Sequence, residues 1–191
     1  INEKDEITIE TLSGIKKLKA YTSGGKVNRL RVDMGKAILD PKEIPVALDG
    51  DKVVDRPVEI AGKNYNITCV SMGNPHCVVF MDDIDNLDIE TIGPEFENDK
   101  LFPERVNTEF VTVLDDHTIK MRVWERGSGE TWACGTGACA VAVAACENGF
   151  CKKGEDIKIK LKGGDLIINY TDETVYMTGN AEKVFEGEVE V

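Results

Sequence analysis

A cysteine stands just before an apolar, alanine-rich stretch in the segment ERGSGETWACGTGACAVAVAACENG, residues 125–149. The residues after Cys134 predict a helix from about Gly135 to Asn148, with Gly149 at its C-terminal cap. The first N–H groups of a helix lack partners within it and carry the positive end of the helix dipole, so they favour an anion. We therefore expect a Cys134 thiolate of lowered pKa, or the carboxylate of a ligand, at this helix start.

Glu125 and Arg126 precede this cysteine at the predicted end of a strand. A guanidinium can bind a carboxylate through two parallel hydrogen bonds, and a glutamate can accept and return the proton of a thiol. The ordinary alternative is an exposed ion pair worth about 0–1 kcal/mol. Because glycine-rich turns and a helix-capping cysteine follow within a few residues, we favour a functional site.

Another candidate cluster lies in the segment SMGNPHCVVF, residues 71–80. A proline holds the residue before it extended, which would fix the amide of Asn74 as a ligand contact. His76 follows this proline, and a lone histidine in a turn is more often solvated than functional. For His117, in a later turn, we keep the solvated interpretation. Asn107, in the segment FPERVNTEFV, is a weak signal when it is taken alone.

The six cysteines are spaced without the paired C-x-x-C pattern of zinc sites. The last four, at positions 134, 139, 146 and 151, are separated by gaps of five, seven and five residues. The sequence also lacks the glycine motifs that bind phosphates or dinucleotides. We therefore predict reduced thiols without a disulfide framework, no metal and no cofactor.

The composition indicates a globular protein with a buried core. The chain has 191 residues, of which 41% are hydrophobic and 30% are charged, and its formal net charge is −12. This charge argues against a nucleic-acid partner, because no basic stripe could follow a phosphate backbone. Its apolar runs are too short to cross a bilayer, so we predict no membrane partner. The reduced thiols favour a cytoplasmic protein.

Alternation of polar and apolar residues predicts a chain made mainly of strands. Hairpins are expected to turn at Ser23–Gly25 and at Asp115–Asp116, and a short helix within residues 84–99 is expected to stop at Gly93–Pro94. A connection from Ala37 to Pro57 follows a domain boundary near Gly35. The other strands are expected at residues 6–14 (ended by a Ser13–Gly14 turn), 63–71 and 77–83, with four more between residues 156 and 191.

The long helix is thin, and apolar residues lie on nearly all of its sides. Its small side chains are those of Ala138, Ala140, Ala142, Ala144 and Ala145. A helix that is apolar all round is a buried helix, and a thin one can lie inside a strongly curled sheet. The predicted fold class is therefore α+β, a mainly antiparallel curled sheet around a central helix.

The chain resembles the diaminopimelate epimerase family. SMGNPHCVVF, FPERVNTEF, ERGSGETWACGTGACA and LKGGDL occur in the order and spacing of that family. The related proline racemases share the CGTG cysteine but not the ERGSGET segment before it. The resemblance implies interconversion of LL- and meso-2,6-diaminopimelate, for lysine and cell-wall precursors, without pyridoxal phosphate or metal. It also implies two cysteines on opposite faces of the α-carbon, one removing a proton and the other delivering one.

Roles for individual residues follow from this resemblance. Cys134 resembles the second of the two cysteines, Glu125 resembles the carboxylate that assists it, and His76 resembles the histidine that assists the first cysteine. The implied ligand is a small amino-acid substrate, diaminopimelate, and a homodimer is left open. The residues that match the family's substrate contacts are Asn74, Asn107, Glu125, Arg126, Gly135 and Thr136.

The chain departs from the family where the first cysteine should be. That cysteine lies in a CGNG-type motif, which these residues lack, and Cys69 and Cys77 have the wrong context to replace it. We therefore expect a truncated epimerase, inactive alone, whose lone segments expose sheet edges and apolar surface. Its parts would be the tail of an incomplete N-terminal domain (1–35), the C-terminal domain (36–179) and a strand returning to the first domain (180–191).

Two alternatives stay open at this stage. One is a related amino-acid racemase or epimerase that acts on another substrate with the same pair of thiols. The other is a non-catalytic module that binds an amino acid at the helix start. Alkylation would distinguish enzyme from module, since a Cys134 of lowered pKa should react faster with iodoacetamide than Cys139 or Cys146.

Overall fold

The structure is a computed structural model that describes residues 5–11 and 14–190. The described strands join in one sheet of 12 strands, in the order β1-β2-β3-β12-β11-β10-β8-β7-β6-β5-β4, with β9 paired to β8. The strands are β1 (Glu6–Thr11), β2 (Gly14–Ser23), β3 (Lys26–Asp33), β4 (Arg56–Ile60), β5 (Lys63–Ser71), β6 (Pro75–Phe80), β7 (Asn107–Asp115), β8 (Thr118–Glu125), β9 (Gly129–Thr131), β10 (Asp156–Leu161), β11 (Gly164–Tyr170) and β12 (Val175–Asn180). The helices are α1 (Ile89–Glu97) and α2 (Gly135–Glu147).

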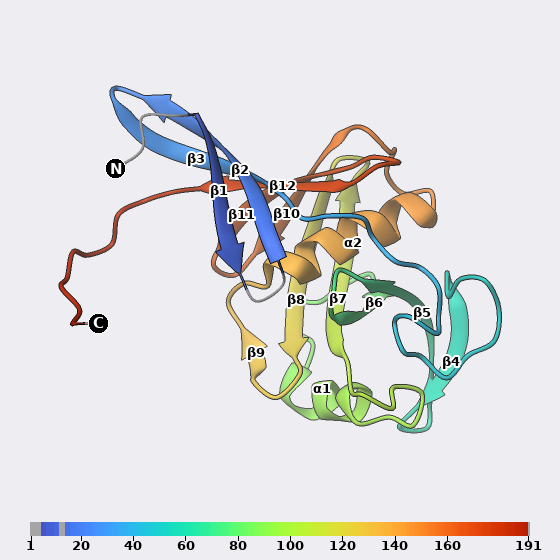
Figure 1. Ribbon diagram of the computed structural model, residues 1–191. Coiled ribbons are helices and arrows are strands. Elements are labelled where there is room, and N and C mark those ends of the chain that lie inside the picture. The colour runs from blue at the N-terminus through green and yellow to red at the C-terminus, as the bar shows by residue number, and fades with distance from the viewer. Residues whose placement is uncertain (1–4, 12–13, 191) are drawn as a thin grey trace.

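The sheet curls around α2, which Figure 1 shows in the middle of the main body of the molecule. Every residue from Gly137 to Ala145 is buried. The sheet is mainly antiparallel, and the pairs β6–β7 and β8–β10 are parallel. The predicted α+β class, with a curled sheet around a central helix, is confirmed.

A second core lies on the face of the sheet away from α2. It includes Phe96 of α1, Phe110 of β7 and Trp124 of β8. Residues of β7 alternate between the two cores, so that Val111 packs on the α2 side while Phe110 packs on the other. The central strands are therefore buried on both faces, and the side chain of each residue reaches the face that its position in the strand dictates.

The short helix differs from the prediction, because α1 runs from Ile89 to Glu97 and does not stop at Gly93–Pro94. Gly93 packs against the indole of Trp124, and a Cβ atom there would lie 2.2 Å from the ring. The glycine therefore serves a close approach of helix and strand, and is not a stop signal. The strands β4 and β9 were not predicted, because each is short and gives little alternation.

The predicted hairpins of β2–β3 and β7–β8 and the strand β5 are confirmed. The strand β6 begins two residues before the predicted 77–83 and ends at Phe80. The predicted connection from Ala37 to Pro57 holds only to Asp55, since β4 begins at Arg56, and Ile38 within it bridges Ser71. Of the four strands expected after residue 156, three form, and residues 181–190 carry no strand. The turn expected at Ser13–Gly14 lies partly outside the described residues.

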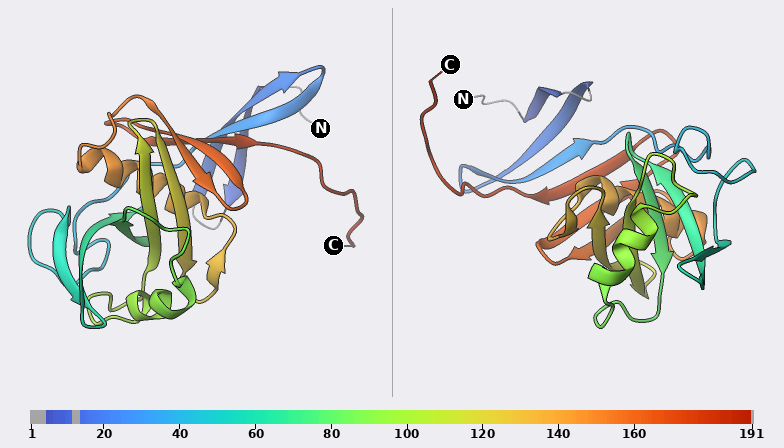
Figure 2. Two further views of the ribbon diagram at one scale, coloured as in Figure 1. Left: turned by 180° about the vertical axis from the view of Figure 1, so that it is seen from behind. Right: turned by 90° about the horizontal axis from the view of Figure 1, so that it is seen from below.

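The β1–β3 strands project from the main body, and residues 181–190 leave it on the same side (Figures 1 and 2). Apolar side chains are exposed on both segments, as predicted: Ile15 is 71% exposed and Phe185 is 82% exposed. The division into two domains stays a prediction. Neither helix of the described residues is long and apolar enough to cross a membrane.

Candidate active site

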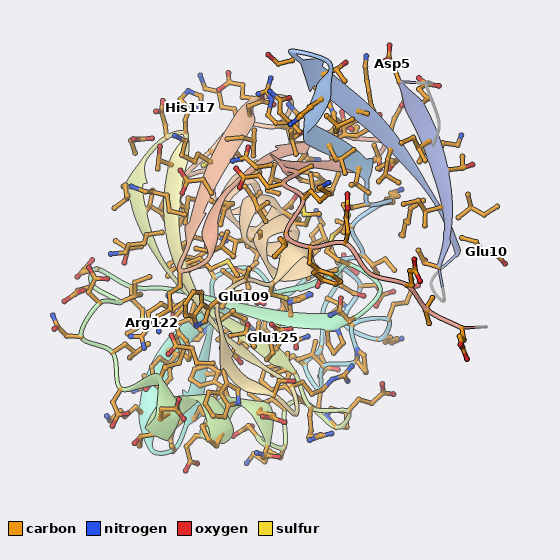
Figure 3. All side chains as sticks on the ribbon, turned by 90° about the vertical axis from the view of Figure 1, so that its left-hand side faces the viewer. Asp5, Glu10, Glu109, His117, Arg122 and Glu125 are labelled. Atoms are coloured by element: carbon orange, nitrogen blue, oxygen red, sulfur yellow. The ribbon has the colours of Figure 1, made fainter. Side chains whose placement is uncertain are left out.

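Three neighbouring strands present polar side chains to the start of α2. In the parallel pair of β6 and β7, His76 lies opposite Asn107. In the antiparallel pair of β7 and β8, Glu109 lies opposite Val123, a residue of the α2 core. Alternate residues of a strand share a face, so Asn107, Glu109 and Glu125 all point to the side of α2. Figure 3 labels Glu109 and Glu125, whose carboxyl groups interact electrostatically.

The cysteine caps the helix, as predicted. Cys134 is the N-cap residue of α2, with φ −131° and ψ 108°, and its Sγ accepts a hydrogen bond of 3.4 Å from the N–H of Gly137. A Cβ atom on Gly137 would lie 2.6 Å from Oε1 of Glu109 and 3.2 Å from Sγ of Cys134. The second glycine of CGTG therefore lets the first helical turn approach both groups.

Hydrogen bonds connect the helix start to His76. The Nδ2 group of Asn74 donates to Oγ1 of Thr136 at 3.3 Å, and this hydroxyl lies 3.6 Å from Sγ of Cys134. Oδ1 of Asn74 lies 3.1 Å from Nε2 of His76. The structure thus brings together four of the residues that were expected at the site.

Glu109 completes this network, although the sequence analysis missed it. Its Oε1 lies 2.7 Å from Nδ1 of His76, and both side chains are fully buried. Burial raises the pKa of the Glu109 carboxyl, His76 opposes that rise, and the negative charge of Glu125 adds to it. The signal that could have found it is a glutamate inside NTEFVTV, where its neighbours are buried on both faces of the strand.

The side chain of Asn107 connects two turns at the edge of the site through hydrogen bonds. Its Nδ2 group donates to the carbonyl of Pro75 at 2.8 Å, and its Oδ1 accepts from the backbone N–H of Arg126 at 3.0 Å. The guanidinium of Arg126 donates to the carbonyl of Glu104 at 2.8 Å. The backbone of Arg126 therefore belongs to the site, and the binding of a ligand carboxylate by its guanidinium stays a prediction.

The turn after β8 is held by another buried carboxylate. Glu97 accepts hydrogen bonds from Nε1 of Trp124 (2.7 Å), from the N–H of Gly127 (2.9 Å) and from Arg105 (3.0 Å). Inside the site, Glu125 accepts a hydrogen bond from the hydroxyl of Thr131 on β9. The position of Glu125 is therefore fixed by both its strand and the loop that follows it.

The predicted lowering of the Cys134 pKa is wrong. Burial raises this pKa to about 12, the carboxylate of Glu109 adds to the rise, and the hydrogen bonds from Thr136 and the Gly137 amide only partly oppose it. Sequence shows the helix start but not the depth of burial or the second carboxylate. Cys134 is therefore a thiol at neutral pH and can act first as an acid.

The outer rim of the site is partly exposed. Cys134 is 6% exposed, while Asn74, Glu125, Gly135 and Thr136 are half-buried. Within residues 14–190, no group accepts a hydrogen bond from the backbone N–H of Gly135 or of Thr136. These two donors, at the positive end of α2, could bind the carboxylate of a ligand.

The other cysteines lie away from this rim. Cys69 and Cys77 face each other across β5 and β6 in the second core, and Cys146 and Cys151 lie at the far end of α2. All six cysteines are unpaired. In the part of the chain that the structure describes, no group of three or more His, Cys, Asp or Glu side chains could hold a metal ion. His117 is exposed in its turn, as expected.

Comparison with known proteins places these residues in a family. The model for diaminopimelate epimerase matches residues 68–184, which include every site residue described above. The chain belongs to the diaminopimelate epimerase family. It is 52% identical to the diaminopimelate epimerase of Acetivibrio thermocellus, over the whole chain and 68% of that relative. It is 48% identical to the enzyme of Methanococcus maripaludis strain S2, over the whole chain and 69% of that relative.

Solved structures share the fold of this family member. A probable proline racemase from Agrobacterium radiobacter K84 superposes with a TM-score of 0.69 at 14% identity, over 94% of the chain and 59% of the racemase. A Bacillus anthracis phenazine biosynthesis protein superposes with a TM-score of 0.63 at 17% identity, over the whole chain and 70% of that protein. At these identities the likeness concerns the fold alone.

Proposed function

We propose that this chain carries one of the two acid–base faces of a cofactor-independent epimerase that interconverts LL- and meso-2,6-diaminopimelate. The observation that supports this best is the Cys134 thiol at the N-cap of α2, beside free helix amides and the Glu125 carboxylate. The names of the relatives, at about half identity over the whole chain, point to the same substrate. A small amino-acid ligand and a cytoplasmic location fit this role.

The chemistry follows from the protonation state of the thiol. The α-carboxylate of the substrate would accept hydrogen bonds from the N–H groups of Gly135 and Thr136. When a base on the opposite face takes the α-proton, negative charge develops at the carbon and its carboxylate, where these amides stabilise it. The S–H bond of Cys134 then breaks and a C–H bond forms on the other face, which inverts the centre.

The reverse direction needs a base beside Cys134. The thiolate left after donation takes a proton from the α-carbon of the next substrate, and Glu125 is close enough to interact with it electrostatically. Glu125 can accept the proton of the Cys134 thiol when the thiolate has to be formed. The hydrogen bond from the Thr131 hydroxyl orients this carboxylate.

The second thiol must come from outside the described site. Cys134 is the cysteine that lies at the rim, and the other five are in the second core, deeper along α2 or at its far end. We therefore propose that the isolated chain binds the substrate but does not invert it. The first-domain assignment of residues 1–35 and 180–191 belongs to the same proposal.

The test compares the isolated chain with a fusion. The fusion joins the chain to the part of the Acetivibrio thermocellus relative that it does not match, and both are incubated with LL-diaminopimelate in heavy water. We expect the meso isomer, deuterated at the inverted carbon, from the fusion only. In the fusion, Cys134→Ser should remove nearly all turnover, while Cys146→Ser, at the far end of α2, should keep it.

Three results would contradict this proposal. Inversion by the isolated chain at the rate of the fusion would show that one thiol of this chain suffices or that another one serves. A folded but inactive fusion that binds diaminopimelate would favour the amino-acid-binding module. A fusion that inverts other amino acids instead would favour a related racemase.

A further inference from the structure

A buried pair of ionisable side chains lies behind the rim of the site. His76 and Glu109 are both fully buried, with Nδ1 and Oε1 2.7 Å apart. The second oxygen of Glu109, Oε2, is buried without a hydrogen-bond partner among the described residues. A buried carboxylate with an unpaired oxygen is costly, so its retention here calls for a role beyond packing.

The hydrogen-bond partners determine where the protons lie. The amide Nδ2 of Asn74 donates to Thr136, so Oδ1 of Asn74 is the atom that faces Nε2 of His76. An amide oxygen only accepts, and therefore Nε2 carries a hydrogen. On the other side of the ring a single proton lies between Nδ1 and Oε1 of Glu109, on the imidazole or on the carboxyl group.

This arrangement gives the network one direction. The imidazole donates to Asn74, Asn74 donates to Thr136, and the hydroxyl of Thr136 has its hydrogen left for Sγ of Cys134 at 3.6 Å. If Nδ1 lacked an acidic partner, the ring could place its one hydrogen there instead. Nε2 would then lose its hydrogen and the direction of the network would no longer be fixed.

We propose that Glu109 is a positioning residue of the epimerase site: its carboxyl group holds the ring of His76 and keeps a hydrogen on Nε2, facing Oδ1 of Asn74. The catalytic consequence rests on the function proposed above, whereas the placement of the proton does not. Other ionisable groups around the pair are Glu125 on β8, Cys134 at the start of α2 and Cys77 on β6.

Nuclear magnetic resonance of the isolated chain tests the placement of the proton. The chain has only two histidines, so the signals of the buried His76 have to be distinguished only from those of the exposed His117. We expect the ¹⁵N signals of His76 to show a hydrogen on Nε2, as its contact with Oδ1 of Asn74 requires.

Two variants of Glu109 and a matched control separate positioning from packing. Glu109→Met removes the partner at similar volume, so His76 should show mixed tautomers or a hydrogen on Nδ1. Glu109→Gln can still donate to Nδ1, so Nε2 should stay protonated even if the methionine variant does not fold. Glu97→Gln, which changes the other buried carboxylate, should leave the His76 signals unchanged.

The active fusion gives the catalytic readout. Glu109→Met should lower kcat by about tenfold to a hundredfold, which is less than the ~10⁴-fold loss when the Ser-His-Asp triad of proteases holds the wrong tautomer. KM should change by less than about threefold, because Glu109 does not touch the substrate. Glu109→Gln should retain more activity than Glu109→Met and have an altered pH profile.

The outcomes keep this proposal separate from the proposed function. Unchanged ¹⁵N signals in Glu109→Met, or loss of the Nε2 hydrogen in Glu109→Gln, would overturn the positioning role whatever the activity. The fusion could instead show the expected hydrogen on Nε2 of His76, and the expected response to the Glu109 variants, without ever epimerising diaminopimelate. That result would overturn the proposed function and leave the positioning role of Glu109 in place.

Discussion

At the scale of single residues, the site shows how burial, with the help of one glutamate, changes the chemistry of a cysteine. The helix start by itself favours the thiolate of Cys134, but burial and the carboxylate of Glu109 favour the thiol. A helix end typically contributes 0.3–1 kcal/mol, and a raised pKa of about 12 shows that desolvation prevails here. The thiol is therefore prepared to donate a proton before it can accept one.

Alkylation rates should reflect this state. We expect Cys134 to react with iodoacetamide at pH 7 no faster than Cys146, because burial raises both pKa values to about 12. The reaction should accelerate as the pH rises above about 9, measured by mass spectrometry of peptides from the folded chain. Rapid and selective modification of Cys134 at pH 7 would contradict the raised pKa. Alkylation thus no longer separates an enzyme from a binding module.

The first turn of α2 allows a direct test of packing. In Gly137→Ala the new Cβ would lie 2.6 Å from Oε1 of Glu109, so we expect a loss of about 1–3 kcal/mol in the free energy of unfolding. Gly135→Ala is the matched control, because its Cβ would meet only the flexible end of Met177, at 3.1 Å from Sδ. Urea unfolding compares them, and equal stabilities of the two variants would show that Glu109 moves away freely.

At the scale of elements, prediction succeeded where hydrophobic period and caps agree. The helix α2, its cysteine cap and the Gly149 end were all visible, because a long apolar run lies between two strong signals. The end of α1 and the role of Glu109 were not visible in the sequence. Both depend on contacts with β8 or β6, and residues in a strand buried on both faces show no alternation. Local pattern cannot reveal which side chain lies across a sheet.

The contact of α1 with Trp124 leads to a prediction of its own. Gly93→Ala would place a Cβ 2.2 Å from the indole ring, so helix and strand must separate. We expect a loss of about 1–3 kcal/mol in unfolding free energy and altered Trp124 fluorescence, since the indole also donates to Glu97. Glu95→Ala, an exposed change on the same helix, should stay within about 0.5 kcal/mol of the parent. An unchanged Gly93→Ala variant would contradict the observed packing.

At the scale of the whole molecule, the side chains that titrate at alkaline pH act together on stability. Several thiol, phenol and amino groups lose a proton at alkaline pH, and folding raises their pKa through burial or through neighbouring side chains. A thiol with a raised pKa keeps its proton when the chain is folded and loses it at lower pH when the chain is unfolded. Each such group stabilises the fold fully below its unfolded pKa, which is about 9 for a thiol and about 10 for a tyrosine or a lysine. This contribution is lost as the pH rises toward the folded pKa. The groups are Tyr65, Cys77, Cys134, Cys139, Cys146, Cys151, Lys153 and Tyr170.

The free energy of unfolding should therefore fall steeply above pH 9. Each thiol that is protonated only in the folded chain lowers it by about 1.4 kcal/mol per pH unit, so several thiols together give a slope that one group could not. Cys139 is the sharpest probe, because it is fully buried and burial raises its pKa to about 12. Cys139→Ser should be less stable at pH 7 yet show a shallower decline between about pH 9 and 11, measured by urea unfolding in steps of pH. If the serine variant and the parent declined in parallel, the Cys139 thiol would not be coupled to folding, and the alkaline loss would have to come from the surface charges of an acidic chain.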